Sequence, residues 1–471
     1  MLSREKVNAQ IAVTEAKIRK LEDELVTERR ILGHLRLLFI FGKLPTELMV
    51  EIFMLAISST PEWPRVLKHI LSLSQVCALW REIVVGSPKI WAQSVVEVCL
   101  DYKQRSVSSK DYLETIFHRS APHSISVSFI CGNRDAPTVH PKINTDAIAR
   151  AISNSAPRWK SLTVGGNYPG WATVDVPLSN LQTLKITAGS LTPTLPLCPN
   201  LCRLTIADIG VNGSSTVDLT PIPLANLTHI DLESFDLASL LSILRQCEKV
   251  VTASLATKLY TWSQVDVDML HDGPVTVLSS LTHLKLKFSR GEPHWKLIGP
   301  FFAPLALPAL RTLRLSFNRS AGIPWPVEAF PTFQMRAPQL SDLCLSGTWI
   351  TSAQLIGVLR LAPALTALSL ICCPECVNDA LFIALTEGPT SAPQLVPQLR
   401  FLYLRDVRSE FGNDKLEAAI RSRGWSEECQ ALNRNRLQKV RILDCFSKTR
   451  ITVLEAKLTD LIWQGFKLVF V

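Results

Sequence analysis

One leucine pattern recurs along most of the sequence, and it restricts the chain to a small set of folds. The pattern is Leu-x-x-Leu-x-Leu, with isoleucine or valine allowed, and weaker copies occur at 159–164 and 250–255. From 159 to 437 the copies are spaced by about 28 residues on average, which is a solenoid period. The nine clear copies begin at Leu181, Leu201, Leu227, Leu281, Leu310, Leu340, Leu365, Leu399 and Leu437.

The local structure of each repeat follows from residue spacing. The last two apolar residues of each copy lie two positions apart, which is the period of a strand with one buried face. Segments such as 237–244 and 353–361 have helical spacing. Proline precedes five copies, where it ends the helix before the next strand. The predicted fold class is α/β, a leucine-rich-repeat solenoid with parallel strands on the concave face and helices and loops on the convex face.

Composition agrees with one large folded body. The 471 residues are 47% apolar and 19% charged, which excludes a mostly disordered chain. Twelve cysteines follow no disulfide framework, and neither a signal peptide nor an apolar run of membrane-spanning length is present. We therefore expect an intracellular protein, in the cytoplasm, the nucleus or both, without a membrane partner. The net charge of +9 is too mild to indicate nucleic acid.

Residues 1–41 are expected to form an amphipathic or coiled-coil helix. Apolar residues recur every seven positions, and two of the four intermediate heptad positions are also leucine, at Leu21 and Leu35. Thr14 and Glu28 occupy the other two, so the apolar seam is imperfect. Two interpretations stay open, a coiled coil that joins two copies and a helix that packs on its own chain. The seven-residue series is Ile11, Ile18, Leu25 and Leu32.

Residues 42–92 form a compact helical block with an ordered motif. It contains LPTELMVEIF at 44–53, a second helix within LSLSQVCALWREI at 71–83, and SPKIW at 87–91. This combination resembles the F-box, a module that binds a Skp-type adaptor and thereby joins a cullin-based ubiquitin ligase. The alternative is an ordinary hairpin whose apolar residues are all internal. The resemblance implies an adaptor-binding surface formed or supported by Leu44, Pro45, Leu48, Ile52, Phe53, Val76, Cys77 and Trp80.

The order of segments resembles that of a wider group. The N-terminal helix, the F-box, RSAPHSISVSF at 119–129 and APRWKSLTV at 156–164 are similar to F-box/leucine-rich-repeat proteins of mushroom-forming (basidiomycete) fungi. Divergent first repeats are expected over 93–156, and the solenoid over 157–471. A helix over 451–461 and a strand from 466 to 470 would cap its C-terminal end. The polar loop 58–69, with PEWPRVLKH, is a variable part of the F-box.

No catalytic constellation is present in the sequence. Phosphate-binding loops, H-E-x-x-H pairs and G-x-S-x-G elbows are all missing. Cys373 and Cys376 form a C-x-x-C without a second pair at zinc spacing, and we interpret them as buried spacers. We therefore expect no enzyme activity, no metal and no cofactor.

The repeat register indicates which residues face a partner. Residues between and just after the two strand leucines lie on the concave face, where solenoids bind. Residues 281–320 carry seven basic side chains and a single acid, Glu292. Our hypothesis is that an acidic or phosphorylated target binds here, and the alternative is that these charges only solvate the face. The residues concerned are Lys285, Lys287, Arg314, Tyr403 and Arg405.

The predicted function is the substrate-recognition subunit of a cullin-based (SCF-type) E3 ubiquitin ligase. The F-box would bind the Skp-type adaptor, and the repeats would bind an unknown target protein. An alternative from another class is a leucine-rich-repeat scaffold for protein–protein interaction without a ligase. A nucleic-acid-binding solenoid rests only on the net charge and the basic strand positions.

Overall fold

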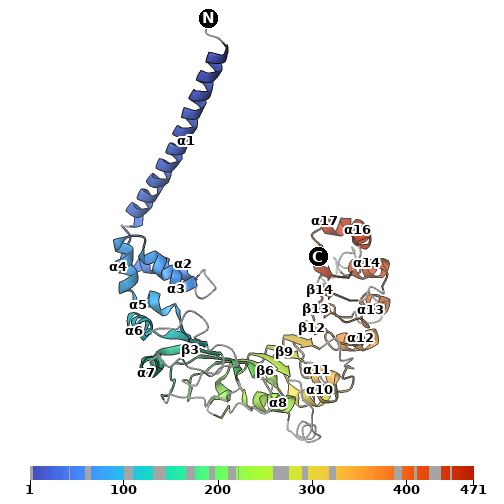
Figure 1. Ribbon diagram of the computed structural model, residues 1–471. Coiled ribbons are helices and arrows are strands. Elements are labelled where there is room, and N and C mark those ends of the chain that lie inside the picture. Colours follow the sequence, from blue (N-terminus) through green and yellow to red (C-terminus); the bar gives the residue numbers. More distant parts are fainter. Residues whose placement is uncertain are drawn as a thin grey trace. The chain divides into compact units, whose positions relative to one another are not determined.

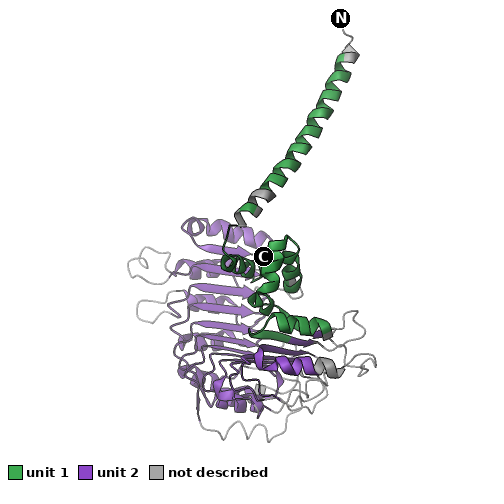
Figure 2. Ribbon diagram, turned by 90° about the vertical axis from the view of Figure 1, so that its left-hand side faces the viewer, with its two compact units in different colours: residues 1–97, 108–127 green, residues 98–107, 128–471 purple. Residues whose placement is uncertain are grey.

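The computed structural model falls into two compact units, residues 1–97 with 108–127, and residues 98–107 with 128–471 (Figure 2). Helices dominate the first unit and a long parallel sheet dominates the second (Figure 1). The structure describes residues 4–41, 43–58, 65–99, 110–130, 145–165, 176–189, 197–209, 219–220, 222–257, 275–288, 295–317, 325–386, 395–407, 411–423, 436–445 and 448–470.

Among the described residues, five short helices follow the long N-terminal helix of the first unit. Ile83 and Val84 of α4 are buried, as is one face of α2. The Trp91 indole N–H donates a hydrogen bond of 2.7 Å to the Val84 carbonyl, which ties α5 to α4. The elements are α1 (Arg4–Phe41), α2 (Thr46–Ser58), α3 (Arg65–Ser74), α4 (Ala78–Gly86), α5 (Pro88–Ala92), β1 (Val95–Cys99), α6 (Lys110–Arg119) and β2 (Ile125–Ile130).

The second helix of this block differs from its prediction over 71–83. Helix α3 ends at Ser74 and α4 begins at Ala78, because the Cys77 backbone between them is extended, with φ −157°. The Ser74 hydroxyl donates to the Leu71 carbonyl at 2.6 Å in the last turn of α3. The loop predicted over 58–69 is shorter, because α3 already begins at Arg65. Residues 59–64, with the PEWP sequence, lie outside the described residues.

Parallel strands in sequence order form the sheet of the second unit. From β3 onward the described strands pair in the order β3-β4-β5-β6-β7-β9-β11-β12-β13-β14-β15-β16. Their bounds are β3 (Trp159–Gly165), β4 (Thr183–Gly189), β5 (Arg203–Ile209), β6 (His229–Phe235), β7 (Thr252–Thr257), β9 (His283–Lys287), β11 (Thr312–Ser316), β12 (Asp342–Ser346), β13 (Ala367–Ile371), β14 (Phe401–Arg405), β15 (Lys439–Leu443) and β16 (Lys467–Phe470).

The apolar pairs of neighbouring repeats are in register. Leu284 lies opposite Leu313, which lies opposite Leu343, and the residues two positions later align in the same way. These alternating residues are buried, whereas the residues between them reach the other face. The fold class predicted from the repeats, a leucine-rich-repeat solenoid, is therefore confirmed.

Helices cover the other side of the sheet in the C-terminal repeats (Figure 1). Segment 237–244 is helical as predicted, and segment 353–361 is helical up to Arg360. Helix α8 begins where the Asp236 carboxylate accepts the Ser239 N–H at 2.6 Å, and Thr351 and Gln354 form a capping box on α12. The helices are α7 (Thr145–Ser155), α8 (Leu237–Gln246), α10 (Trp295–Phe302), α11 (Ala329–Met335), α12 (Ser352–Arg360), α13 (Asp379–Leu385) and α14 (Asn413–Arg421).

The C-terminal segment adds two helices and the last strand of the sheet. The single helix expected over 451–461 is divided into α16 (Lys448–Lys457) and α17 (Thr459–Trp463), because Leu458 leaves the helical conformation, with ψ 10°. Arg421 of α14 donates to Asp460 at 2.7 Å and so holds α17. Gly465, with φ +100°, provides the left-handed turn into β16.

Arg423 at the end of α14 joins three backbone segments. Its side chain is buried, with the residue 4% exposed, and donates to the carbonyls of Leu385, Val396 and Leu395 at 2.9, 2.8 and 2.6 Å. The Val396 carbonyl also accepts the Leu399 N–H at 3.1 Å, so among the described hydrogen bonds it is the carbonyls of Leu385 and Leu395 that depend on the guanidinium.

We expect Arg423→Met to lower the free energy of unfolding by about 3 kcal/mol, because two buried carbonyls lose their donor and a third, that of Val396, loses one of two. Urea denaturation and amide hydrogen exchange in β14 would measure the loss. The matched variant Arg421→Met breaks a more exposed ion pair and should lower it by about 1 kcal/mol at most. Equal losses in the two variants would contradict this interpretation.

Candidate functional site

Helix α2 is apolar on two faces. Leu48, Ile52 and Leu55 follow one another at i, i+4 and i+7, so they share a face. Their exposed fractions are 52%, 38% and 71%. An ordinary surface helix has polar residues on its outward face, so this exposed stripe is a candidate interaction surface. The buried face consists of Met49, Phe53 and Ile57.

Further apolar side chains are exposed in α3, in α4 and in the turn between them. Leu71, Val76 and Leu79 are all exposed. Val76 belongs to the predicted adaptor surface, whereas Leu55, Leu71 and Leu79 are not among the residues that the F-box resemblance indicated. Their exposure could not be read from the sequence, because apolar residues at helical spacing predict a buried face equally well.

The remaining predicted adaptor residues lie around these helices. Leu44 is half-buried and Pro45 is exposed just before α2, and the Pro45 carbonyl accepts the Met49 N–H at 3.1 Å. Cys77 is the half-buried residue that precedes α4. Phe53 is 1% exposed, and its ring centroid lies 4.7 Å from that of Trp80. Phe53 therefore supports the surface from inside and does not form it.

The second candidate surface is the outward face of the solenoid strands. Because the register is maintained, equivalent residues of successive repeats form rows across the sheet. The central row, between the two strand leucines, is Thr163, Lys185, Thr205, Asp231, Ser254, Lys285, Arg314, Cys344, Ser369, Tyr403, Arg441 and Val469.

Positive side chains gather on β9 and β11. Lys285 lies directly opposite Arg314, with His283 and Lys287 two positions to either side of Lys285. All four side chains are exposed. Like charges directly opposite each other on neighbouring strands repel, so an anion placed between them would be favoured. We call His283, Lys285, Lys287 and Arg314 the basic cluster.

Asp342 on β12 borders the basic cluster. Burial raises the pKa of its carboxyl group, and electrostatic interactions with Arg314 and His283 act in the opposite direction. Asp342 lies opposite Thr312, and Cys344 opposite Arg314. The positive surface therefore ends at β12.

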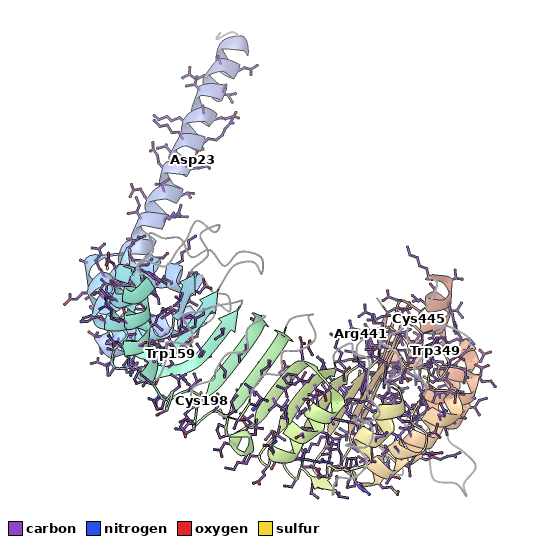
Figure 3. The ribbon with its side chains drawn as sticks, turned by 60° about the horizontal axis from the view of Figure 1, so that its bottom comes forward. Asp23, Trp159, Cys198, Trp349, Arg441 and Cys445 are labelled. Atoms are coloured by element: carbon purple, nitrogen blue, oxygen red, sulfur yellow. The ribbon has the colours of Figure 1, made fainter. Side chains whose placement is uncertain are left out.

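A second group lies on β14 and β15. The Arg441 guanidinium is 5.6 Å from the centroid of the Tyr403 ring, a cation–π distance (Figure 3 labels Arg441). Arg405 Nε is 3.5 Å from Asp444 Oδ2, so part of its charge is neutralised. Phe401 is exposed two positions before Tyr403. We call Phe401, Tyr403, Arg405 and Arg441 the aromatic cluster.

The five residues predicted to bind a target thus form two groups. Between Arg314 and Tyr403 the central row contains Cys344 and Ser369, on β12 and β13. Three strand spacings separate the groups by about 14 Å. An extended peptide covers this distance with about four residues. Sequence reasoning missed His283 and Phe401 because it considered the positions between and after the strand leucines, and not those before them.

The C-x-x-C pair is buried. Cys373 and Cys376 are both fully buried, and the Cys373 thiol donates to the Leu345 carbonyl at 3.5 Å. Within the described ranges, no three His, Cys, Asp or Glu side chains come together as metal ligands would. The described helices also include none with the length and apolarity needed to cross a membrane.

Comparisons with known proteins found no matching family model and no matching curated protein. Two similar solved structures are the Toll–Spätzle complex of Drosophila, at 12% identity and TM-score 0.30, and a TLR13–ssRNA13 complex, at 14% and 0.20. Each match covers 67% of this chain, but 43% and 59% of the solved chains, less than two thirds of either. At these values the likeness carries no argument, and the fold rests on the strand register described above.

Cys344 gives a chemical test of the concave face. Burial raises the pKa of its thiol to about 11, so the thiolate that reacts with alkylating reagents is scarce at neutral pH. We expect its iodoacetamide rate, followed by mass spectrometry of its peptide, to increase about tenfold per pH unit up to pH 9.5 without levelling. A plateau near pH 8.5 would mean that the thiol is more exposed than described.

Proposed function

We propose that this protein is the substrate-recognition subunit of a cullin-based E3 ubiquitin ligase. The helices α2–α5 would act as an F-box that binds a Skp-type adaptor, and the solenoid would hold the target. The observation that carries the proposal is the second apolar face of α2. The F-box resemblance of residues 44–91 supplies the identity of the partner.

The apolar face also favours the F-box interpretation of this block over an ordinary hairpin. In an ordinary hairpin, Leu48, Ile52 and Leu55 would be internal, yet all three are exposed while Met49, Phe53 and Ile57 already fill the interior. When a partner covers an exposed leucine or isoleucine, the complex is stabilised by roughly 1.5 to 3 kcal/mol for each fully buried side chain. An adaptor that covers this face would thus bind through several side chains at once.

We expect Leu48→Glu with Ile52→Glu to weaken binding of a purified Skp-type adaptor at least about 100-fold, because two carboxylates would enter an apolar interface. Isothermal titration calorimetry on the full chain would measure the affinity. The matched control is Val85→Glu, at a similarly exposed apolar position of α4 that lies about 120° around the helix from Leu79.

Three outcomes have distinct meanings. Loss in the double variant with retention in Val85→Glu supports the F-box assignment. Equal loss in both variants means general disruption, which circular dichroism would detect. A wild-type chain that binds no Skp-type adaptor would favour the alternative, a leucine-rich-repeat scaffold without a ligase.

The charges on the concave face of the solenoid favour a target with negative charge. The basic cluster offers exposed cations on adjacent strands, and the aromatic cluster offers two rings and two arginines on β14 and β15. Arginine and lysine bind carboxylate and phosphate groups through charge-assisted hydrogen bonds. The target segment would therefore be acidic or phosphorylated at one end and carry an apolar group at the other.

We expect Lys285→Glu, Lys287→Glu and Arg314→Glu together to reduce recovery of the target at least about tenfold, because three attractive charges become repulsive. Quantitative mass spectrometry of proteins that co-purify from native extract would compare this variant with Lys185→Glu, which changes an exposed lysine of the central row on β4. The adaptor should remain bound in both. If no co-purifying protein is lost from the triple variant while it is retained by Lys185→Glu, the basic cluster is not the target site.

A further inference from the structure

Helix α1 lacks tertiary packing in its described part. Every described side chain from Val7 to Gly33 is exposed, around the whole helix, as Figure 3 shows near Asp23. At 1.5 Å per residue, a helix of 38 residues is about 57 Å long. Helices in proteins obtain most of their stability from packing of an apolar face, so α1 has a face whose partner is not in its own described chain.

The exposed face of α1 is a heptad stripe. Ile11, Ile18, Leu21, Leu25 and Leu32 are between 48% and 54% exposed, and they repeat with the spacing of a coiled-coil seam. The two isoleucines occupy the first core position of their heptads and Leu21 the second, an arrangement that favours two strands. The stripe therefore fits one other helix of the same kind.

Charges beside the stripe define the orientation of that second helix. In a parallel pair, the residue before the first core position faces the residue five positions later in the other helix. Lys17 would then face Glu22 of the second copy, and Glu24 would face Arg29 of the second copy. Gln10 would face Glu15 of the second copy, and this pair of an uncharged and a charged residue is neither attractive nor repulsive. Among these described positions each facing pair is attractive or neutral.

The polar seam residues limit the affinity and set the register. Thr14 and Glu28 occupy core positions, so in a parallel, in-register pair each would face its own counterpart. Polar core residues specify register at a cost in stability. The Lys20 to Glu24 ion pair within the helix, at 3.9 Å, lies at exposed positions and competes only weakly with contacts between helices.

We propose that α1 joins two copies of this chain as a parallel, in-register, two-stranded coiled coil. The inference is independent of the ligase function, because it uses only residues 7–33. Analytical ultracentrifugation of the full chain should give a concentration-dependent dimer. Leu21→Asp with Leu25→Asp should give a monomer at all concentrations tested, with helices α2–α5 and the solenoid unaffected in hydrogen exchange.

A charge exchange tests the orientation. Lys17→Glu should raise the dimer dissociation constant roughly tenfold, because two attractive pairs per dimer become repulsive. Adding Glu22→Lys should restore the wild-type constant, since the pair is then reversed and attractive again. In an antiparallel pair these two positions do not face each other, so the second change would give no recovery. Glu28→Leu should tighten the parallel dimer, because two facing carboxylates are removed from the seam.

Each result decides the proposal. A wild-type monomer at all concentrations, or a dimer that survives Leu21→Asp with Leu25→Asp, would overturn it. Failure of Glu22→Lys to rescue Lys17→Glu would overturn the parallel arrangement. Loss of the dimer in Leu21→Asp with Leu25→Asp, rescue of Lys17→Glu by Glu22→Lys, and a tighter dimer in Glu28→Leu would together establish it.

Discussion

The in-register stacking of apolar pairs is the constraint on which the solenoid depends. Leu313 and Leu315 of β11 are buried between the equivalent apolar pairs of β9 and β12. In an isolated repeat such a pair would have no neighbouring pair to cover it. The same register that aligns the buried leucines aligns the outward residues between them. Core packing therefore decides which charges meet on the concave face, and the basic cluster is a consequence of Lys285 and Arg314 having the same position in their repeats.

The repeats could be predicted from sequence because they depend on a two-residue period that local chemistry seldom overrides. Strand β1 was not recognised, since Val95–Cys99 has buried Val96 and Val98 but no leucine pattern before them. The break between α3 and α4 was also missed. There the Cys77 backbone is extended and the Ser74 hydroxyl bonds to the Leu71 carbonyl, both of which are local features of the chain. Such features leave no periodic signal.

The sequence predicts the candidate site on the strands more completely than the candidate site on α2. Register alone correctly places Lys285 beside Arg314. The distance from this pair to Tyr403 is different. It follows only when the two repeats between Arg314 and Tyr403 are each counted as one strand of the sheet, β12 and β13. In α2 the limit is physical: both faces are apolar, so spacing cannot say that Phe53 is internal while Ile52 is exposed. The packing seen in the fold, such as that of Phe53 against Trp80, distinguishes the two faces.

The weakness of exposed charges gives the proposed dimer a consequence for binding. Contacts to exposed lysine and arginine contribute at most about 1 kcal/mol each, so a single basic cluster holds an acidic segment loosely. Two solenoids joined through α1 would present two such clusters on one assembly. The second contact would then form at the high effective concentration set by the link, which raises overall affinity without any new residue in the site. A target with two acidic segments would be retained where a target with one segment dissociates.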